Sequence, residues 1–178
     1  MKENTFGYLL SITPPSWDFR GSPYLWNDIK QTLLNEELPN TFEEAFSKIA
    51  DLFEKCTGKK IDCGEDFGVQ KYAHGGMSSG GISANFWNTK LKGFLQKSFQ
   101  YLKNPVEIDD SVKKIMEKEN KDIAVLAFSN KGKDVFFLYD SNAKSYNLNL
   151  PIAVIKKGKR AKKTDYYNIV DKYDKDIN

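Results

Sequence analysis

The sequence has few of the residues on which metal and redox sites most often depend. Its 178 residues include one histidine, His74, and two cysteines, Cys56 and Cys63. The spacing of the cysteines is not the C-x-x-C of a redox or zinc-ribbon site, so a zinc site made of Cys56, Cys63 and His74 is only a minor alternative. Residues 1–10 lack the features of a signal peptide, which predicts a cytoplasmic protein with reduced thiols.

Long apolar runs and linkers are also missing. No stretch approaches the roughly 20 apolar residues that span a bilayer, so no transmembrane helix and no membrane partner are predicted. We find no internal repeat, no low-complexity block and no linker between two halves. Because 40% of the residues are hydrophobic and 13% are aromatic, the chain can build a core. We therefore expect one domain over 1–178, with a frayed polar end at about 173–178.

Arginine is scarce, although the chain is mildly basic. The formal net charge is +3, and Arg20 and Arg160 are the only arginines among 27 basic residues. Proteins that read base edges depend on arginine, so sequence-specific DNA recognition is disfavoured. Six of the eight residues of 156–163 are basic. This segment, which includes Lys159 and Arg160, predicts either a contact surface for an anionic partner, with non-specific nucleic acid as a weaker option, or a solvated loop.

Hydrophobic periodicity predicts an α+β fold with a C-terminal β-meander. The sheet is expected to be antiparallel or mixed and to pack against two to four helices. Thr41 to Glu44 has the pattern of a capping box, and Asp109-Asp110 that of an N-cap. Strands are predicted at 5–12, 67–73, 123–129, 135–139, 145–150 and 151–155, and helices at 23–34, 41–57, 84–103, 111–118 and 164–172.

A glycine- and serine-rich segment between a predicted strand and a predicted helix is the strongest candidate for a site. Four of the twelve glycines fall within seven residues. A helix N-terminus presents unpaired N–H groups, and glycines let the backbone approach a ligand closely. The segment therefore predicts a cradle for a phosphorylated small molecule or nucleotide, made of Lys71, Gly75, Gly76, Ser78, Ser79, Gly80, Gly81 and Ser83, with His74 as an acid or base at its mouth.

The same segment has a plainer interpretation. It matches neither the G-x-x-x-x-G-K-[ST] nor the G-x-G-x-x-G motif of nucleotide-binding proteins, and it lacks the G-x-S-x-G nucleophile elbow. The segment therefore predicts no particular cofactor. It can instead be a flexible connection in which Ser83 caps the next helix, with His74 as an ordinary surface or structural histidine. Whether the chain is an enzyme therefore stays open. The acidic pair Glu65-Asp66 is a minor candidate for a metal, and we predict no metal site.

A second candidate surface is the loop that contains Trp17, Asp18 and Arg20. Tryptophan and arginine are typical of interface hot spots, so this loop predicts binding of a protein partner. The alternative is that Trp17 and its neighbour Phe19 cover the edge of the core. Together with the basic segment at 156–163, the loop supports an alternative function for the chain, as a phage or mobile-element inhibitor or immunity protein that acts by binding another protein.

Overall fold

The structure is a computed structural model, and it describes residues 2–13, 23–57, 92–119, 121–130, 133–142, 151–156, 158–162 and 169. Within these residues it contains five helices and one four-stranded antiparallel sheet. The predicted α+β class is therefore confirmed. The elements are α1 (Phe6–Ile12), α2 (Pro23–Thr32), α3 (Phe42–Thr57), α5 (Lys92–Lys103), α6 (Asp110–Lys118), β1 (Ile123–Asn130), β2 (Lys133–Asp140), β3 (Ala153–Lys156) and β4 (Lys159–Arg160).

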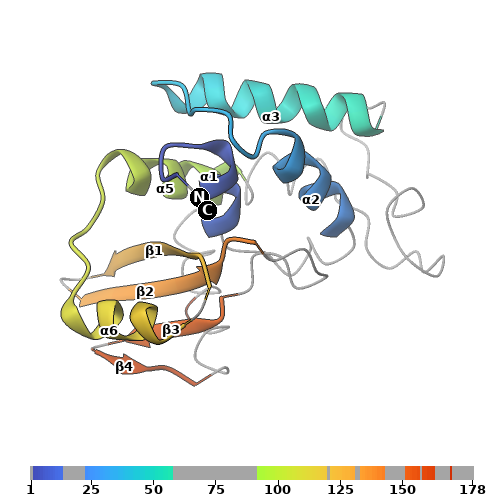
Figure 1. Ribbon diagram of the computed structural model, residues 1–178. Helices are drawn as coiled ribbons and strands as arrows, with labels where there is room; N and C mark the ends of the chain where they lie inside the picture. Colours follow the sequence, from blue (N-terminus) through green and yellow to red (C-terminus); the bar gives the residue numbers. More distant parts are fainter. Residues whose placement is uncertain are drawn as a thin grey trace.

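The described elements are stacked in layers (Figure 1). Helix α3 lies outermost at one end, and α1, α2 and α5 lie between it and the sheet; these four helices share a first apolar cluster. Helices α1 and α5 also cover one face of the sheet through a second cluster, and α6 covers the opposite face through a third. Three helices thus pack on the sheet, within the predicted range. The outer helix α3 and the edge strand β4 lie at opposite ends of the molecule.

The sheet is a meander in the order β1-β2-β3-β4. Its register pairs Ile123 with Asp140 and Val135 with Lys156. Alternate residues of the strands point to the two faces, and both faces are buried under helices. This explains why β1 and β2 are almost continuously apolar in sequence rather than alternating with polar residues. The predicted C-terminal meander is confirmed, with β3 starting at Ala153.

Helix α1 corrects the prediction of a strand at 5–12. Thr5 is its N-cap and accepts a hydrogen bond from the backbone N–H of Tyr8 at 3.3 Å. Thr13 ends the helix, and its backbone N–H donates to the carbonyl of Leu9. All seven residues of the helix are buried because other helices and the sheet surround it. The periodicity of a short apolar run fits a buried strand and a buried helix equally well. Here the packing of the surrounding elements stabilises the helix.

The first turn of α1 is held by the chain segment that follows α2. The backbone N–H of Phe6 donates to the carbonyl of Glu36 at 2.9 Å, and that of Gly7 donates to the carbonyl of Leu34 at 3.1 Å. These bonds satisfy N–H groups that a helix cannot pair internally. A Cβ at Gly7 would lie 2.3 Å from the Leu34 oxygen, so only glycine allows this close approach.

The predicted caps are present where the structure describes them. Thr41 accepts from the backbone N–H of Glu44 at 3.3 Å, and Asp109 accepts from that of Val112 at 3.1 Å. Of the helix predicted at 84–103, only α5 falls in the described part. The predicted strands at 67–73 and 145–150 lie outside the described residues, as does the helix at 164–172 apart from Ile169. Among the described residues, no helix combines the length and the apolar character that crossing a membrane requires.

Candidate functional site

Most residues of the predicted sites lie outside the described part of the chain. This holds for the partner-binding residues Trp17, Asp18 and Arg20, for Cys63, for His74 and for the predicted phosphate cradle at 71–83. Cys56 is described. It is a half-buried cysteine near the end of α3, packed against the core. The two remaining predicted site residues, Lys159 and Arg160, are both described and both exposed.

The basic segment at 156–163 begins as a β-hairpin rather than an open loop. Strand β3 pairs with β4, so that Lys156 lies directly opposite Lys159. The turn contains Gly158 with a φ of 75°, a left-handed conformation that glycine adopts without strain. The ladder continues one residue further, where the N–H of Ala161 donates to the carbonyl of Val154 at 2.7 Å. The sheet therefore holds the backbone of the basic residues in a defined position.

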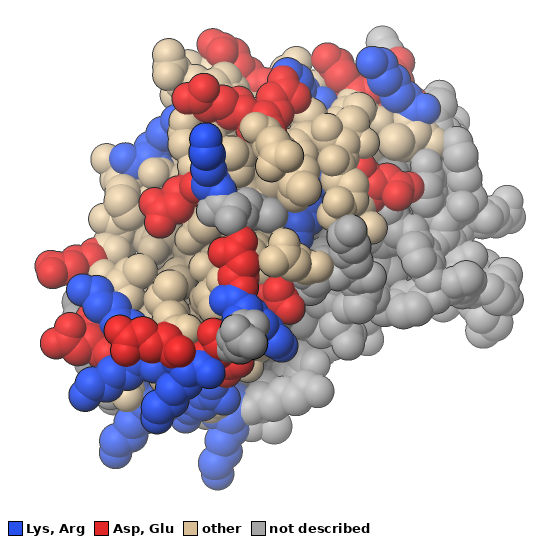
Figure 2. All heavy atoms as spheres, in the orientation of Figure 1, with Lys and Arg blue, Asp and Glu red and all other residues tan. Residues whose placement is uncertain are grey.

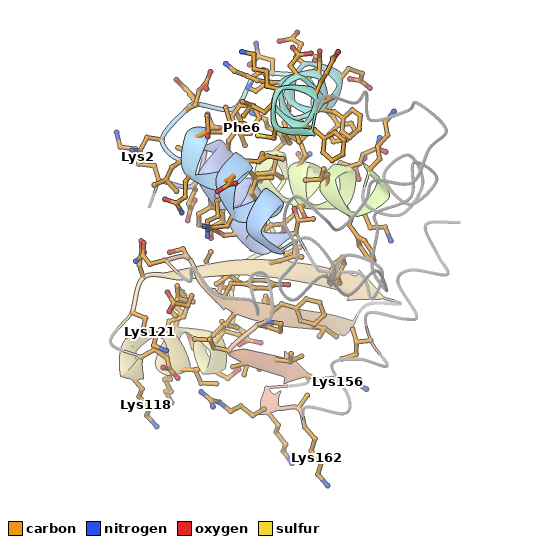
Figure 3. The ribbon with its side chains drawn as sticks, turned by 90° about the vertical axis from the view of Figure 1, so that its right-hand side faces the viewer. Lys2, Phe6, Lys118, Lys121, Lys156 and Lys162 are labelled. Carbon is orange, nitrogen blue, oxygen red and sulfur yellow. The ribbon has the colours of Figure 1, made fainter. Side chains whose placement is uncertain are left out.

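Further lysines come from α6 and from the start of β1. The lower end of the molecule in Figure 2 carries many basic side chains over α6, β3 and β4. In the view from the side, the labelled Lys118, Lys121, Lys156 and Lys162 lie at this same end (Figure 3). We call this set the basic surface, and it consists of the exposed residues Lys113, Lys114, Lys118, Lys121, Lys156, Lys159, Arg160 and Lys162.

The basic surface also contains carboxylates. Nη2 of Arg160 donates to Oε1 of Glu119 at 3.0 Å, and this ion pair joins β4 to the end of α6. The Lys121 ammonium lies 4.0 Å from the carboxylate of Asp140. Because the charge of Arg160 is compensated, this arginine positions the hairpin against α6. The hairpin lysines for which the described part of the chain records no ion pair are Lys156 and Lys159.

Lys156 and Lys159 form a pair of like charges across the hairpin. Like charges directly opposite each other on two strands destabilise the pairing. Within the described ranges, the structure records no ion pair for either ammonium group. Both side chains are exposed, so an anionic group from outside can approach the two ammonium groups together. This is the arrangement that an anion-binding surface requires.

The basic surface rests on a rigid support. Val112, which is fully buried, and the neighbouring Ile115 and Met116 of α6 pack against the face of the sheet that carries Phe136 and Ile155. Helix α6 and strand β3 of the hairpin therefore share one apolar cluster on this face of the sheet. Side chains that project from elements packed in this way need little backbone ordering when they bind a partner.

Two buried polar side chains were not singled out from the sequence. The hydroxyl of Tyr8 accepts a hydrogen bond from the backbone N–H of Val125 at 3.0 Å. Burial raises the pKa of Tyr8 to about 12. Lys30 of α2 is 1% exposed, and its ammonium donates to the carbonyl of Ser141 at 2.9 Å. Both contacts join the helical layers to the sheet, which gives them structural roles. Tyr8 lies in an apolar run and Lys30 among polar residues, so neither differs from its neighbours in a way that marks it.

We compared the chain with protein-family models, curated proteins and solved structures. No family model, no curated protein and no solved structure matches this chain. In the described ranges, no group of three or more histidine, cysteine, aspartate or glutamate side chains could hold a metal ion. Among the described residues, the basic surface is therefore the feature that points to a function.

Proposed function

We propose that this chain is a binding protein that contacts the acidic surface of a protein partner through its basic surface. The like-charge pair of Lys156 and Lys159 carries the proposal. Lysines on an edge strand such as β4 discourage pairing with another sheet, but two of them placed opposite each other weaken the hairpin itself. A carboxylate of a partner placed between them turns a repulsive pair into two attractive contacts.

The carboxylates within the surface favour a protein partner over nucleic acid. Glu117 and Glu119 stand on α6 beside the lysines, and Asp109 and Asp110 stand at its start. A nucleic-acid backbone carries closely spaced phosphates, and these carboxylates would repel it. A protein surface of mixed charge can place its own cations opposite them.

Fluorescence anisotropy with two probes of matched charge tests the proposal. One probe is a labelled peptide rich in glutamate and aspartate, and the other is a labelled single-stranded oligonucleotide. The test variant is Lys156→Glu with Lys159→Glu, which keeps a like-charge pair in the hairpin and reverses only its sign. The control variant is Lys2→Glu with Lys55→Glu, which changes the net charge equally at two exposed lysines outside the basic surface and leaves the ion pair of Lys48 with Glu36 intact.

We expect the wild-type protein and the control variant to bind the peptide, with at least about a tenfold loss in the hairpin variant. Tighter binding of the oligonucleotide, with an affinity that falls steeply with salt, would replace the proposal with nucleic-acid binding. Binding of neither probe at high protein concentration would contradict the proposal.

We also propose the phosphate cradle at 74–83 as a second function, supported by the sequence pattern alone. His74, the paired glycines and the serines precede the helix predicted at 84–103, and α5 is the described part of that range. The test is the thermal stability of the protein in a panel of nucleotides and in inorganic phosphate. A rise in Tm that disappears in the variant His74→Ala with Gly76→Val supports this function, and a panel without any shift contradicts it.

A further inference from the structure

The end of the molecule opposite the basic surface carries α3, whose exposed carboxylates outnumber its exposed lysines, Lys48 and Lys55. Glu43, Glu44, Asp51 and Glu54 of α3 are all exposed. Acidic side chains gather at the upper end of the space-filling view, over α3 (Figure 2). Both ribbon views place α3 at one end and β4 at the other (Figures 1 and 3).

The acidic residues of α3 share one face of the helix. At about 100° per residue, these four carboxylates fall within an arc of roughly 100°. The buried residues of α3, among them Ala45, Ile49 and Phe53, lie on the other side and pack on the core. The carboxylate stripe runs about 16 Å along the helix axis, at a rise of about 1.5 Å per residue.

We propose that the partner of the basic surface is a second copy of this chain, whose α3 supplies the carboxylates. This inference rests on the proposed function and names its partner. The two surfaces are opposite in charge, and each is held by a rigid element, namely the sheet with α6 on one side and a packed helix on the other. Carboxylates of the α3 stripe would approach the Lys156 and Lys159 ammonium groups.

The position of the two surfaces determines the form of the assembly. A contact between different surfaces of identical subunits is heterologous, and it continues into a ring or an open chain unless something stops it. Here the surfaces lie at opposite ends, so copies would follow one another head to tail. Because all the charged groups are exposed, added salt should screen their attraction strongly.

Sedimentation velocity on the whole chain tests this inference. For the wild type we expect a mean sedimentation coefficient that rises with protein concentration at low ionic strength. At high salt, the apparent association constant should fall by about tenfold or more. A wild-type protein that stays monomeric across this concentration range at low salt would overturn the inference.

Two charge-reversal variants provide a sharper test. The hairpin variant Lys156→Glu with Lys159→Glu keeps an intact α3, and the helix variant Asp51→Lys with Glu54→Lys keeps an intact basic surface. Each variant alone should be monomeric. An equimolar mixture should associate again, because the intact basic surface of one variant meets the intact α3 of the other, and the two reversed surfaces are also complementary in charge. Circular dichroism checks that both variants are folded.

The outcomes separate the inference from the proposed function. If the wild type associates but the mixture of variants does not, the contact lies elsewhere and the inference is wrong. If self-association is absent while the acidic peptide still binds the wild type and not the hairpin variant, the inference fails and the proposed function stands. If the peptide does not bind and self-association is absent, both fail.

Discussion

Replacing Tyr8 with phenylalanine removes one hydroxyl group from the interface between α1 and the sheet. Val125 lies in β1, an edge strand of the described sheet, and its backbone N–H donates to the Tyr8 hydroxyl at 3.0 Å. Val125 is 1% exposed and Tyr8 is 7% exposed, so water has little access to this bond. In Tyr8→Phe the ring still packs on the sheet, but the N–H of Val125 loses its acceptor.

The expected loss of stability follows from that unpaired donor. A buried N–H left without a partner costs about 1–3 kcal/mol, more than the net worth of an ordinary hydrogen bond. For a domain of this size, each kcal/mol lowers Tm by roughly 2–4 °C. The free energy of unfolding should therefore fall by about 1–3 kcal/mol, with little change in the far-ultraviolet circular dichroism spectrum.

Urea denaturation of the wild type and of two variants measures this loss. The matched control is Tyr101→Phe, since Tyr101 belongs to the same cluster but no hydrogen bond of its hydroxyl is recorded in the described part of the chain. Tyr101→Phe should lower the free energy of unfolding clearly less than Tyr8→Phe does. A Tyr8→Phe protein within about 0.5 kcal/mol of wild type, at an unchanged m-value, would refute this account of how α1 joins the sheet.

Three further predictions concern stability. The pKa of Tyr8 is raised by burial to about 12, above the value near 10 of an unfolded tyrosine. The contribution of the neutral Tyr8 side chain to the free energy of unfolding is therefore complete below about pH 10 and is lost as the pH rises through about 12. Denaturation curves in this range should show a smaller loss for Tyr8→Phe than for wild type, and equal losses would contradict the assignment. Gly7→Ala should destabilise the fold by about 1–3 kcal/mol or more, because the new Cβ meets the Leu34 carbonyl. Gly158→Ala should lower the free energy of unfolding by about 1–2 kcal/mol. The cause is the left-handed φ alone, because a Cβ at this position would have room. An unchanged urea midpoint in either glycine variant would count against the packing or the turn described for it.

Local sequence signals were sufficient for much of the fold. The caps at Thr41 and Asp109 marked helix starts, and the apolar runs of β1 and β2 marked the hairpin. Helix α1 could not be predicted, because a run of seven apolar and small residues fits a buried strand equally well. Its helical state depends on bonds to Leu34 and Glu36 and on packing from both sides, and neither is visible in its own residues.

The candidate surface was predictable only in part. The cluster at 156–163, with Lys159 and Arg160, could be found by counting charges. The opposition of Lys156 and Lys159 depends on the register of the hairpin, which the turn at Gly158 determines. The addition of the α6 lysines depends on the packing of α6 on the sheet, a contact between segments about 40 residues apart in sequence. The charge pattern of the sequence alone predicts neither the hairpin register nor the packing of α6.

The most direct test of the basic surface is the anisotropy titration of the acidic peptide with wild type and with Lys156→Glu, Lys159→Glu. Because the variant keeps the like-charge pair and changes only its sign, the comparison isolates attraction to carboxylates. We predict binding by the wild type and at least about a tenfold weaker affinity in the variant. Equal affinities for the two proteins would contradict the central claim.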